Sequence, residues 1–324
     1  MKVIKMDKTV NGLEKILKSG DFENIYREAD RIRRENKGDV IHIRAILEFS
    51  NYCKRQCLYC GLNCKNSNIT RFRIPPEEMI QTAKEAARVG YRTIVLQSGE
   101  DRWYTSSILG EIVKEIKKTG MKITLSCGEL SFDEYAFLKS CGADRYLLKH
   151  ETSDETLYEE LHPCGTFYNR INCLKQLKTL GYRIGSGFMI GLPGQTFKTI
   201  AKDILLLKEL SCDMAGIGPF LPHQDTLLRK IPPGSAEFTK RAVALTRILL
   251  PNIDLPATTS LGVLNQEQKA SIFSCGANVI MKKVTPDHYK HLYEIYPSKM
   301  GKTDIKVERQ LLEKEIKALG KIPL

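Results

Sequence analysis

Three cysteines near residue 55 are the most reactive feature of the sequence. Cys53, Cys57 and Cys60 are spaced C-x3-C-x2-C. Thiolates this close together can converge on one metal centre, and soft sulfur ligands favour zinc or an iron–sulfur cluster. A structural zinc site usually has four ligands, and Cys64 could be the fourth. Three cysteines alone would leave one iron of a four-iron cluster open to the amine and carboxylate of a small ligand.

Other polar residues follow short β-branched segments of the chain. Gly99 and Glu100 come after the segment 93–97, and Glu151 comes after the segment 145–149. Arg170 falls in the first turns of an expected helix, where its guanidinium could bind a carboxylate. Because parallel barrels collect their chemistry at the carboxyl ends of strands, we expect these side chains to face one site.

The elements that would position these residues alternate between strand and helix. This alternation, with eight strands, predicts a single-domain α/β protein with a (β/α)8 TIM-type barrel, and an open doubly wound sheet is the competing arrangement. The expected strands are 40–47, 93–97, 122–126, 145–149, 183–189, 213–218, 255–259 and 278–281. The expected helices between them are 76–89, 107–119, 132–141, 167–180, 196–210, 235–249 and 266–274.

The two ends of the chain are expected to lie outside the barrel. Residues 1–39 predict an N-terminal helical cap over the barrel bottom, residues 40–300 the barrel, and residues 301–324 a C-terminal helical extension. The N-terminus lacks the apolar core of a secretory signal, and no long apolar run predicts a membrane span. We therefore expect a cytoplasmic protein with reduced cysteines.

The formal charge of +12 admits nucleic acid or an anionic small molecule as a partner. The basic residues are scattered, however, and no dense basic arm is present. This pattern indicates a lysine-rich solvated surface, so we expect no nucleic-acid partner.

The cysteine spacing, with Tyr59 before the last cysteine, resembles the signature of the radical SAM superfamily. The resemblance implies one [4Fe–4S] cluster on Cys53, Cys57 and Cys60, with S-adenosylmethionine (SAM) on its open iron. It also implies that Glu100 receives the methionine ammonium, Glu151 the ribose and Arg170 the methionine carboxylate. The residues implied for SAM binding are Tyr59, Gly99, Glu100, Ser126, Glu151, Arg170, Ile190 and Leu192.

Longer phrases, including residues 95–101, 142–148, 216–220 and 276–281, are similar to the HydE group of [FeFe]-hydrogenase maturases, a biotin synthase-like branch of that superfamily. This resemblance implies a 5′-deoxyadenosyl radical that acts on a cysteine-bound iron carbonyl/cyanide precursor. It implies the maturases HydG and HydF and an electron donor as partners. The residues implied for the substrate cavity are Arg44, Gln97, Thr124, Arg145, Lys149, Met214, Thr258, Thr259 and Tyr293.

Several alternatives remain open from the sequence. Arg145 and Lys149 could face an anionic substrate or pair with buried carboxylates. The runner-up activity is that of a methylornithine-synthase-like radical mutase, whose substrate would be an amino acid. An RNA-modifying radical enzyme would need an RNA-binding module that the chain has no residues left to build. No cysteine occurs in the segment 301–313, where some relatives carry a second cluster, so one cluster is expected.

Overall fold

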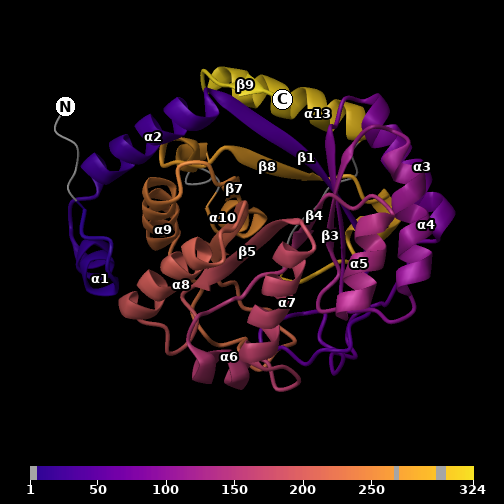
Figure 1. Cartoon of the computed structure of the whole chain (residues 1–324), viewed down its shortest axis with the longest axis horizontal. Helices are drawn as coiled ribbons and strands as arrows, with labels where there is room; N and C mark the ends of the chain where they lie inside the picture. The colour runs from indigo at the N-terminus through magenta and orange to yellow at the C-terminus, as the bar shows by residue number, and fades with distance from the viewer. Residues whose placement is uncertain (1–5, 266–269, 297–303) are drawn as a thin grey trace.

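The computed structural model describes residues 6–265, 270–296 and 304–324 of the chain. Its centre is a sheet of parallel strands in the order β6-β5-β4-β3-β2-β1-β8-β7, with the short β9 beside β1 (Figure 1). The strands are β1 Val40–Ser50, β2 Thr93–Ser98, β3 Lys122–Ser126, β4 Arg145–Leu147, β5 Arg183–Ile190, β6 Met214–Pro219, β7 Pro256–Ala257, β8 Val279–Lys283 and β9 Ile322–Pro323.

A single bridge between Met214 and Asp254 brings the two edges of the sheet together. The main-chain amide of Ala215 donates to the Asp254 carbonyl at 3.0 Å, and the Asp254 amide donates to the Asp213 carbonyl at 2.9 Å. The sheet is therefore a nearly closed barrel, and the predicted (β/α)8 architecture is confirmed.

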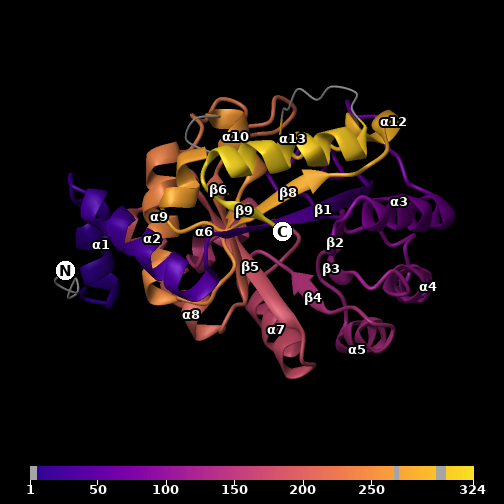
Figure 2. The same cartoon turned by 90° about the horizontal axis from the view of Figure 1, so that it is seen from above.

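Helices follow most strands and cover the outside of the barrel (Figures 1 and 2). The helices are α1 Val10–Lys18, α2 Glu23–Lys37, α3 Pro76–Arg88, α4 Ser106–Lys117, α5 Phe132–Ser140, α6 Glu155–Leu161, α7 Phe167–Thr179, α8 Phe197–Glu209, α9 Ala236–Leu249, α10 Thr259–Leu264, the short 3-10 helix η1 Ile272–Ser274, α12 Asp287–Lys290 and α13 Ile305–Ala318. None of the helices in the described part of the chain is long and apolar enough to cross a membrane.

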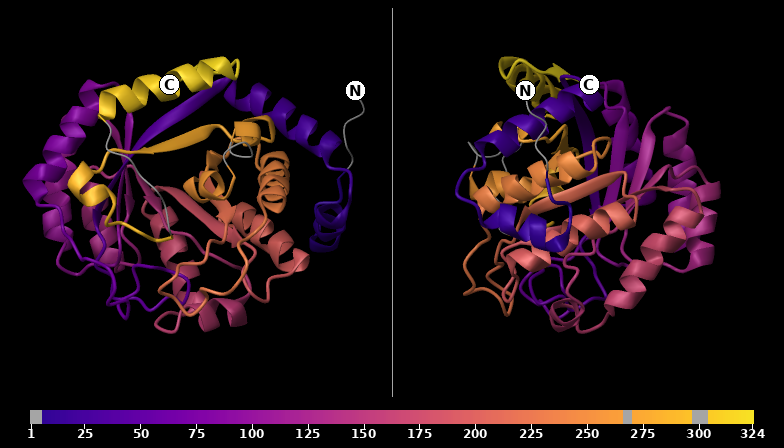
Figure 3. Two further views of the ribbon diagram at one scale, coloured as in Figure 1. Left: turned by 180° about the vertical axis from the view of Figure 1, so that it is seen from behind. Right: turned by 60° about the vertical axis from the view of Figure 1, so that its left-hand side comes forward.

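The terminal helices pack on the outside of the barrel. Helix α1 packs against α8, and α2 packs against α9. At the other end of the chain, α13 lies across β1 and β8, and the chain then returns as β9 alongside β1 (Figures 2 and 3). Apolar side chains from the barrel and its helices form one continuous core.

The sequence placed most elements correctly, with a few differences. Strand β7 ends at Ala257, and Thr258 is the N-cap of α10, so the predicted strand 255–259 is wrong at its end. Helices α6 and α10 are too short to show a clear 3.6-residue pattern and were not predicted. In the predicted helix 266–274, residues 266–269 lie outside the described part of the chain, and Ile272–Ser274 forms a 3-10 turn.

Candidate active site

One cavity of about 370 Å³ lies within the barrel at the carboxyl ends of its strands. The three cysteines line it together with most of the other predicted site residues. Those residues are Tyr59, Gln97, Gly99, Glu100, Ser126, Lys149, Glu151, Arg170, Thr258, Thr259 and Tyr293. A cavity of this size, with a few converging polar groups, can hold small ligands.

The cysteine loop runs between β1 and α3 and is fixed by main-chain contacts to the end of β2. The Lys54 amide donates to the Glu100 carbonyl at 3.1 Å. The Cys53 Sγ accepts from the main-chain amides of Arg55 and Glu100, both at 3.4 Å. At Gly99 an added Cβ would lie 2.2 Å from the Tyr52 carbonyl oxygen, so only glycine allows this approach.

The cysteine side chains are partly withdrawn from water. Burial raises the pKa of all three thiols, and that of Cys60 to about 12. A metal must therefore displace protons to gain thiolate ligands, which makes metal binding here dependent on pH.

A chain of ion pairs connects the cysteine loop to helix α7. Arg55 Nε lies 2.7 Å from Glu100, and its Nη2 lies 2.6 Å from Glu129. Glu129 also pairs with Arg170 at 2.7 Å. Thr166 is the N-cap of α7, and its side chain accepts a hydrogen bond from the Asn169 amide. This cap fixes where the helix begins and therefore where Arg170 lies. Burial opposes ionisation of Glu129, but the two arginines hold its pKa below its ordinary value.

Glu151 occupies a strained position at the end of β4. Its backbone has φ of 63°, which is unusual for a residue with a side chain. Two main-chain hydrogen bonds to β5 keep it there, from the Glu151 amide to Gly187 O and from the Met189 amide to Glu151 O. Lys149 Nζ lies 2.9 Å from the Glu151 carboxylate. Burial alone would raise the Glu151 pKa, but Lys149 lowers it, so the carboxylate is charged.

Two apolar residues predicted for SAM binding, Ile190 and Leu192, do not line the cavity. Ile190 is 2% exposed and packs into the main core. Leu192 packs in a small cluster with Phe220 and the ring of Tyr59. Because side chains alternate along a strand, Met189 lines the cavity instead of Ile190, and the predicted contact of these two side chains with the cavity is corrected.

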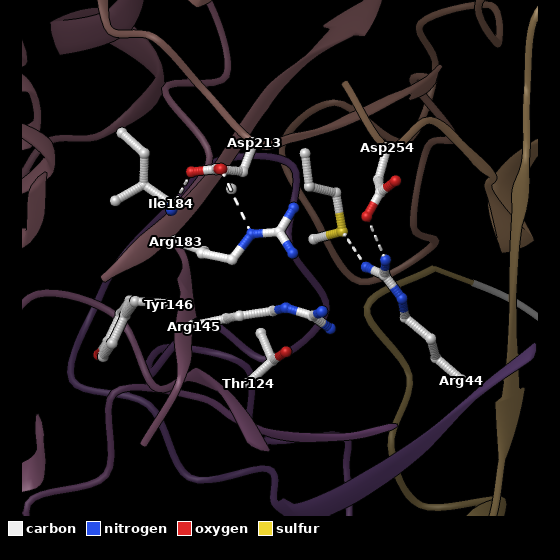
Figure 4. A pocket seen from close by; sticks show the side chains of 10 residues that line it. Arg44, Thr124, Arg145, Tyr146, Arg183, Ile184, Asp213 and Asp254 are labelled. Carbon is white, nitrogen blue, oxygen red and sulfur yellow. Dashed lines mark hydrogen bonds and ion pairs between the residues drawn. The ribbon is translucent and has the colours of Figure 1, made fainter. Parts of the chain in front are cut away.

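Four residues predicted for the substrate cavity lie at the opposite, amino-terminal end of the barrel. Arg44, Thr124, Arg145 and Met214 line a separate small pocket there (Figure 4). Arg44 Nη2 binds Asp254 at 2.5 Å, and its Nη1 lies 2.9 Å from the Met214 sulfur. These positions correct the prediction that all four residues face one cavity.

The physical reason for this correction is depth along the strand. Thr124 and Ser126 share one strand face, as do Arg145 and Lys149, but only the second residue of each pair lines the large cavity. Two residues of strand, as from Thr124 to Ser126, span about 7 Å, and four extended residues, as from Arg145 to Lys149, about 13 Å, enough to place the members of each pair at different depths of the barrel interior. The alternation of side chains along a strand predicts which face of the strand a residue lies on, but not which layer of the barrel interior it occupies.

The cation on β4, Arg145, and the cation just after it, Lys149, also differ in their partners. Lys149 pairs with the carboxylate of Glu151, which agrees with the alternative that it would pair with a buried carboxylate. Arg145 makes no ion pair with any carboxylate of the described residues; its Nη1 lies 3.5 Å from the Thr93 hydroxyl. Burial and the nearby Arg44 and Arg183 lower the pKa of Arg145 to about 10.

The sequence and the fold of this chain are similar to those of several known proteins. The profile of the radical SAM superfamily matches residues 47–207. The chain is 50% identical over 281 residues to "[FeFe] hydrogenase maturase subunit HydE" of Thermotoga maritima, covering 87% of this chain and 81% of that protein. This chain belongs to the HydE family of radical SAM enzymes.

More distant similarities agree with this membership. The HydE-family chain is 29% identical to 3-methylornithine synthase of Methanosarcina acetivorans, over 82% of this chain and 76% of that protein. Its fold matches the crystal structure of methylornithine synthase (PylB) with a TM-score of 0.88 at 24% identity, covering 99% of this chain and 95% of that one. Because its sequence identity is only 24%, the match to the methylornithine synthase structure supports the barrel fold and says nothing about the reaction.

The HydE-family membership implies a [4Fe–4S] cluster and SAM, and the cysteines present fit the cluster. All three line one cavity, whereas Cys64 is exposed and does not line it. Among the described residues no three His, Cys, Asp or Glu side chains are grouped so as to hold a single metal ion. Three thiols on one cavity fit a cluster of several irons, whereas a structural zinc ion usually takes four protein ligands and Cys64 does not line the cavity. When bound, the cluster would supply the single electron that cleaves SAM.

The sequence prediction missed several residues of this HydE-family site. Glu129 and Arg55 complete the ion-pair chain, and the Tyr59 hydroxyl lies 2.8 Å from His162 Nε2. Glu48 and Lys283 also line the cavity. A signal existed for Glu48, because it shares a strand face with Arg44 while the opposite face of that strand is apolar. Glu129 gave no such signal, since only the fold brings it to Arg170.

Proposed function

We propose that this chain is a maturase of [FeFe]-hydrogenase that assembles part of the di-iron subsite of the H-cluster. One electron from a low-potential donor would cleave SAM to methionine and a 5′-deoxyadenosyl radical. That radical would attack the sulfur of a cysteine-bound iron carbonyl/cyanide precursor. The identity of 50% to a HydE protein along most of both chains supports this proposal.

The observation that carries the proposal is the single cavity shared by the cysteines and the polar strand ends. The cluster ligands Cys53, Cys57 and Cys60 line it beside Glu100, Glu151 and Arg170, which we assign to SAM. Gln97, Lys149, Thr258, Thr259 and Tyr293 line the same cavity and are assigned to the substrate. A radical formed there would meet its substrate inside the barrel, away from bulk solvent.

The remaining assignments follow from this role. We propose one cluster per chain, a cytoplasmic location, and function alongside the maturases HydG and HydF, with HydG supplying the precursor and HydF receiving the product. We propose no nucleic-acid or membrane partner. Residues 1–39 and 301–324 are proposed as extensions that support the barrel 40–300 from outside.

Anaerobic turnover tests the proposal. After reconstitution with iron and sulfide, the chain is expected to bind about four irons and to release 5′-deoxyadenosine with dithionite and SAM. A synthetic iron–cysteine carbonyl/cyanide complex is then added, and turnover is followed by EPR. A new iron-centred signal that depends on SAM is expected.

A mutase is the second candidate, since 3-methylornithine synthase is 29% identical to this chain. The same preparation is therefore offered lysine, and the products are analysed by mass spectrometry. Methylornithine formation, with no reaction of the iron complex, would replace the maturase proposal by the mutase. If no 5′-deoxyadenosine is released with the iron complex and none with lysine, both the maturase and the mutase proposals are contradicted.

A further inference from the structure

A second pair of charges lies in the wall of the cavity, apart from the residues assigned to SAM. Glu48 on β1 and Lys283 on β8 both line the cavity, and Lys283 Nζ lies 2.8 Å from Glu48 Oε2. Their side chains are only 5% and 13% exposed. The two strands are parallel neighbours, so the pair sits on one side of the barrel interior.

Burying such a pair is not a simple gain in stability. Removing two charges from water costs as much as their attraction returns, and apolar side chains of similar size would often serve the fold as well. A buried pair that also lines a cavity is therefore a candidate functional site. Burial raises the pKa of Glu48 to about 7 even with Lys283 beside it, so the pair is only weakly stabilised in its charged form.

Neutral hydrogen-bonding groups surround the pair. Gln97 Nε2 donates to the Tyr293 hydroxyl at 3.3 Å, and the Lys283 ammonium lies 6.0 Å from the centre of the Tyr293 ring. Tyr296 also lines this part of the cavity. Lys290 is buried and also acts on the Glu48 carboxylate, but it does not line the cavity, so Glu48 and Lys283 are the charges that this side of the cavity presents. The neutral groups beside them can accept or donate hydrogen bonds to a ligand.

The charges assigned to SAM are held in other contacts. Arg170 is paired with Glu129, Lys149 with Glu151, and Glu100 with Arg55. If Glu100 and Arg170 bind the amino-acid end of SAM and Glu151 binds its ribose, a second amino-acid group in the cavity needs its own carboxylate and cation. Glu48 and Lys283 supply one of each, 2.8 Å apart, beside which the ammonium and the carboxylate carried by one α-carbon can each face the opposite charge.

We propose that Glu48 and Lys283 form a subsite for the α-amino-acid group of the substrate. The Glu48 carboxylate would accept from the amine N–H groups, and the Lys283 ammonium would bind the α-carboxylate. An amine retains N–H donors whether it is a free ammonium or is coordinated to a metal. The inference rests on the proposed function, because it assumes that SAM occupies the Glu100, Glu151 and Arg170 side of the cavity.

Binding of S-methyl-L-cysteine tests the subsite, because its thioether leaves the cluster thiolates undisturbed. Binding is measured by calorimetry on the reconstituted full chain with saturating SAM and without reductant. Two comparison ligands are N-acetyl-S-methyl-L-cysteine, which lacks the ammonium, and S-methyl-L-cysteine amide, which lacks the carboxylate. The wild-type protein is expected to bind the parent amino acid at least about tenfold more tightly than either comparison ligand.

The variants separate the two charges. Glu48→Gln is expected to remove the preference over the N-acetyl ligand, and Lys283→Met the preference over the amide. Lys282→Met is the matched control, since Lys282 is 36% exposed, pairs with Glu308 on α13 and does not line the cavity. It should keep both preferences. For each variant we compare the ratio of its affinities for the three ligands, and only when its iron content and thermal melting match those of the wild-type protein. Lys283→Arg keeps the positive charge and should retain part of the preference over the amide ligand.

Two results would overturn the subsite. One is equal binding of all three ligands by the wild-type protein. The other is binding of S-methyl-L-cysteine only when SAM is left out of the titration, which would place the pair in the SAM site. Neither depends on turnover, so loss of 5′-deoxyadenosine release in the wild-type protein would count against the proposed function and not against the subsite.

Discussion

Cys57 and Cys64 lie in the same loop but in different surroundings. Cys57 lines the cavity, whereas Cys64 is exposed and its main-chain amide is bonded to the Arg55 carbonyl. We expect Cys57→Ala to lose most of the bound iron and all release of 5′-deoxyadenosine, because three thiolates are the minimum for the cluster. Cys64→Ala, the control, should keep both. Iron analysis and product chromatography measure the outcome, and SAM cleavage by Cys57→Ala would disprove the ligand assignment.

Glu129 holds two arginines of the site at once. Replacing it with glutamine leaves Arg55 and Arg170 without a shared carboxylate. We expect the KM for SAM to rise about tenfold, since Arg170 would no longer be held in place, with a smaller change in kcat. The matched control is Glu111→Gln, whose surface pair with Lys114 contributes little. A fall in kcat at an unchanged KM would contradict the positioning role of Glu129.

At the scale of elements, the close packing of the cysteine loop on β2 makes Gly99 a sensitive position. A Cβ there would meet the Tyr52 carbonyl at 2.2 Å and the Cys53 Cβ at 2.8 Å, and the backbone cannot move aside cheaply. We expect Gly99→Ala to displace the loop and reduce iron binding by more than half, with an overpacking cost of about 1–3 kcal/mol.

Gly20→Ala is the control for this element, because nothing lies within 4 Å of a Cβ added at that position. Thermal melting of the cluster-free protein and iron content after reconstitution report on the two variants. Normal iron binding by Gly99→Ala would show that the loop does not depend on its contact with β2.

At the scale of the whole molecule, Asp254 closes the barrel. It forms the bridge to β6, and its side chain binds Arg44 at 2.5 Å and Lys37 at 3.0 Å. Burial by itself would raise its pKa, but Arg44 and Lys37 hold the pKa well below its usual range. We expect Asp254→Asn to lower the free energy of unfolding by about 3–5 kcal/mol at neutral pH, because the buried Arg44 and the partly buried Lys37 lose their partner.

The sign of the pH effect follows from the lowered pKa. A depressed acid stabilises the fold fully above its unfolded pKa of about 3.9, and this contribution declines as the pH falls below that value. Urea unfolding of the cluster-free chain from neutral pH to about pH 3 should therefore show the wild-type protein and the variant converging. The control Asp213→Asn should cost under about 1 kcal/mol, since the partner Arg183 is half exposed. A pH-independent gap between Asp254→Asn and wild type would refute this account.

The sequence by itself determined the reactive loop and the succession of elements. The spacing of Cys53, Cys57 and Cys60 is local, and helix starts such as the Ser131 capping box depend on residues a few positions apart. Strand ends and helix starts are also local, which is why Glu100, Glu151 and Arg170 could be predicted to face one site from their positions in the chain. These features need no knowledge of distant contacts.

The tertiary structure decided which layer of the barrel each inward-facing residue occupies. Arg44 and Arg145 face the interior, yet they lie below the cavity, because alternation specifies a face and strand stagger specifies the depth. Contacts between distant segments, such as Glu129 with Arg170 and Glu48 with Lys283, exist only when the barrel closes. Short-range spacing of residues therefore determines the chemistry of the cysteine loop. The shape and charge of the cavity beside that loop depend instead on how the eight strands come together in the barrel.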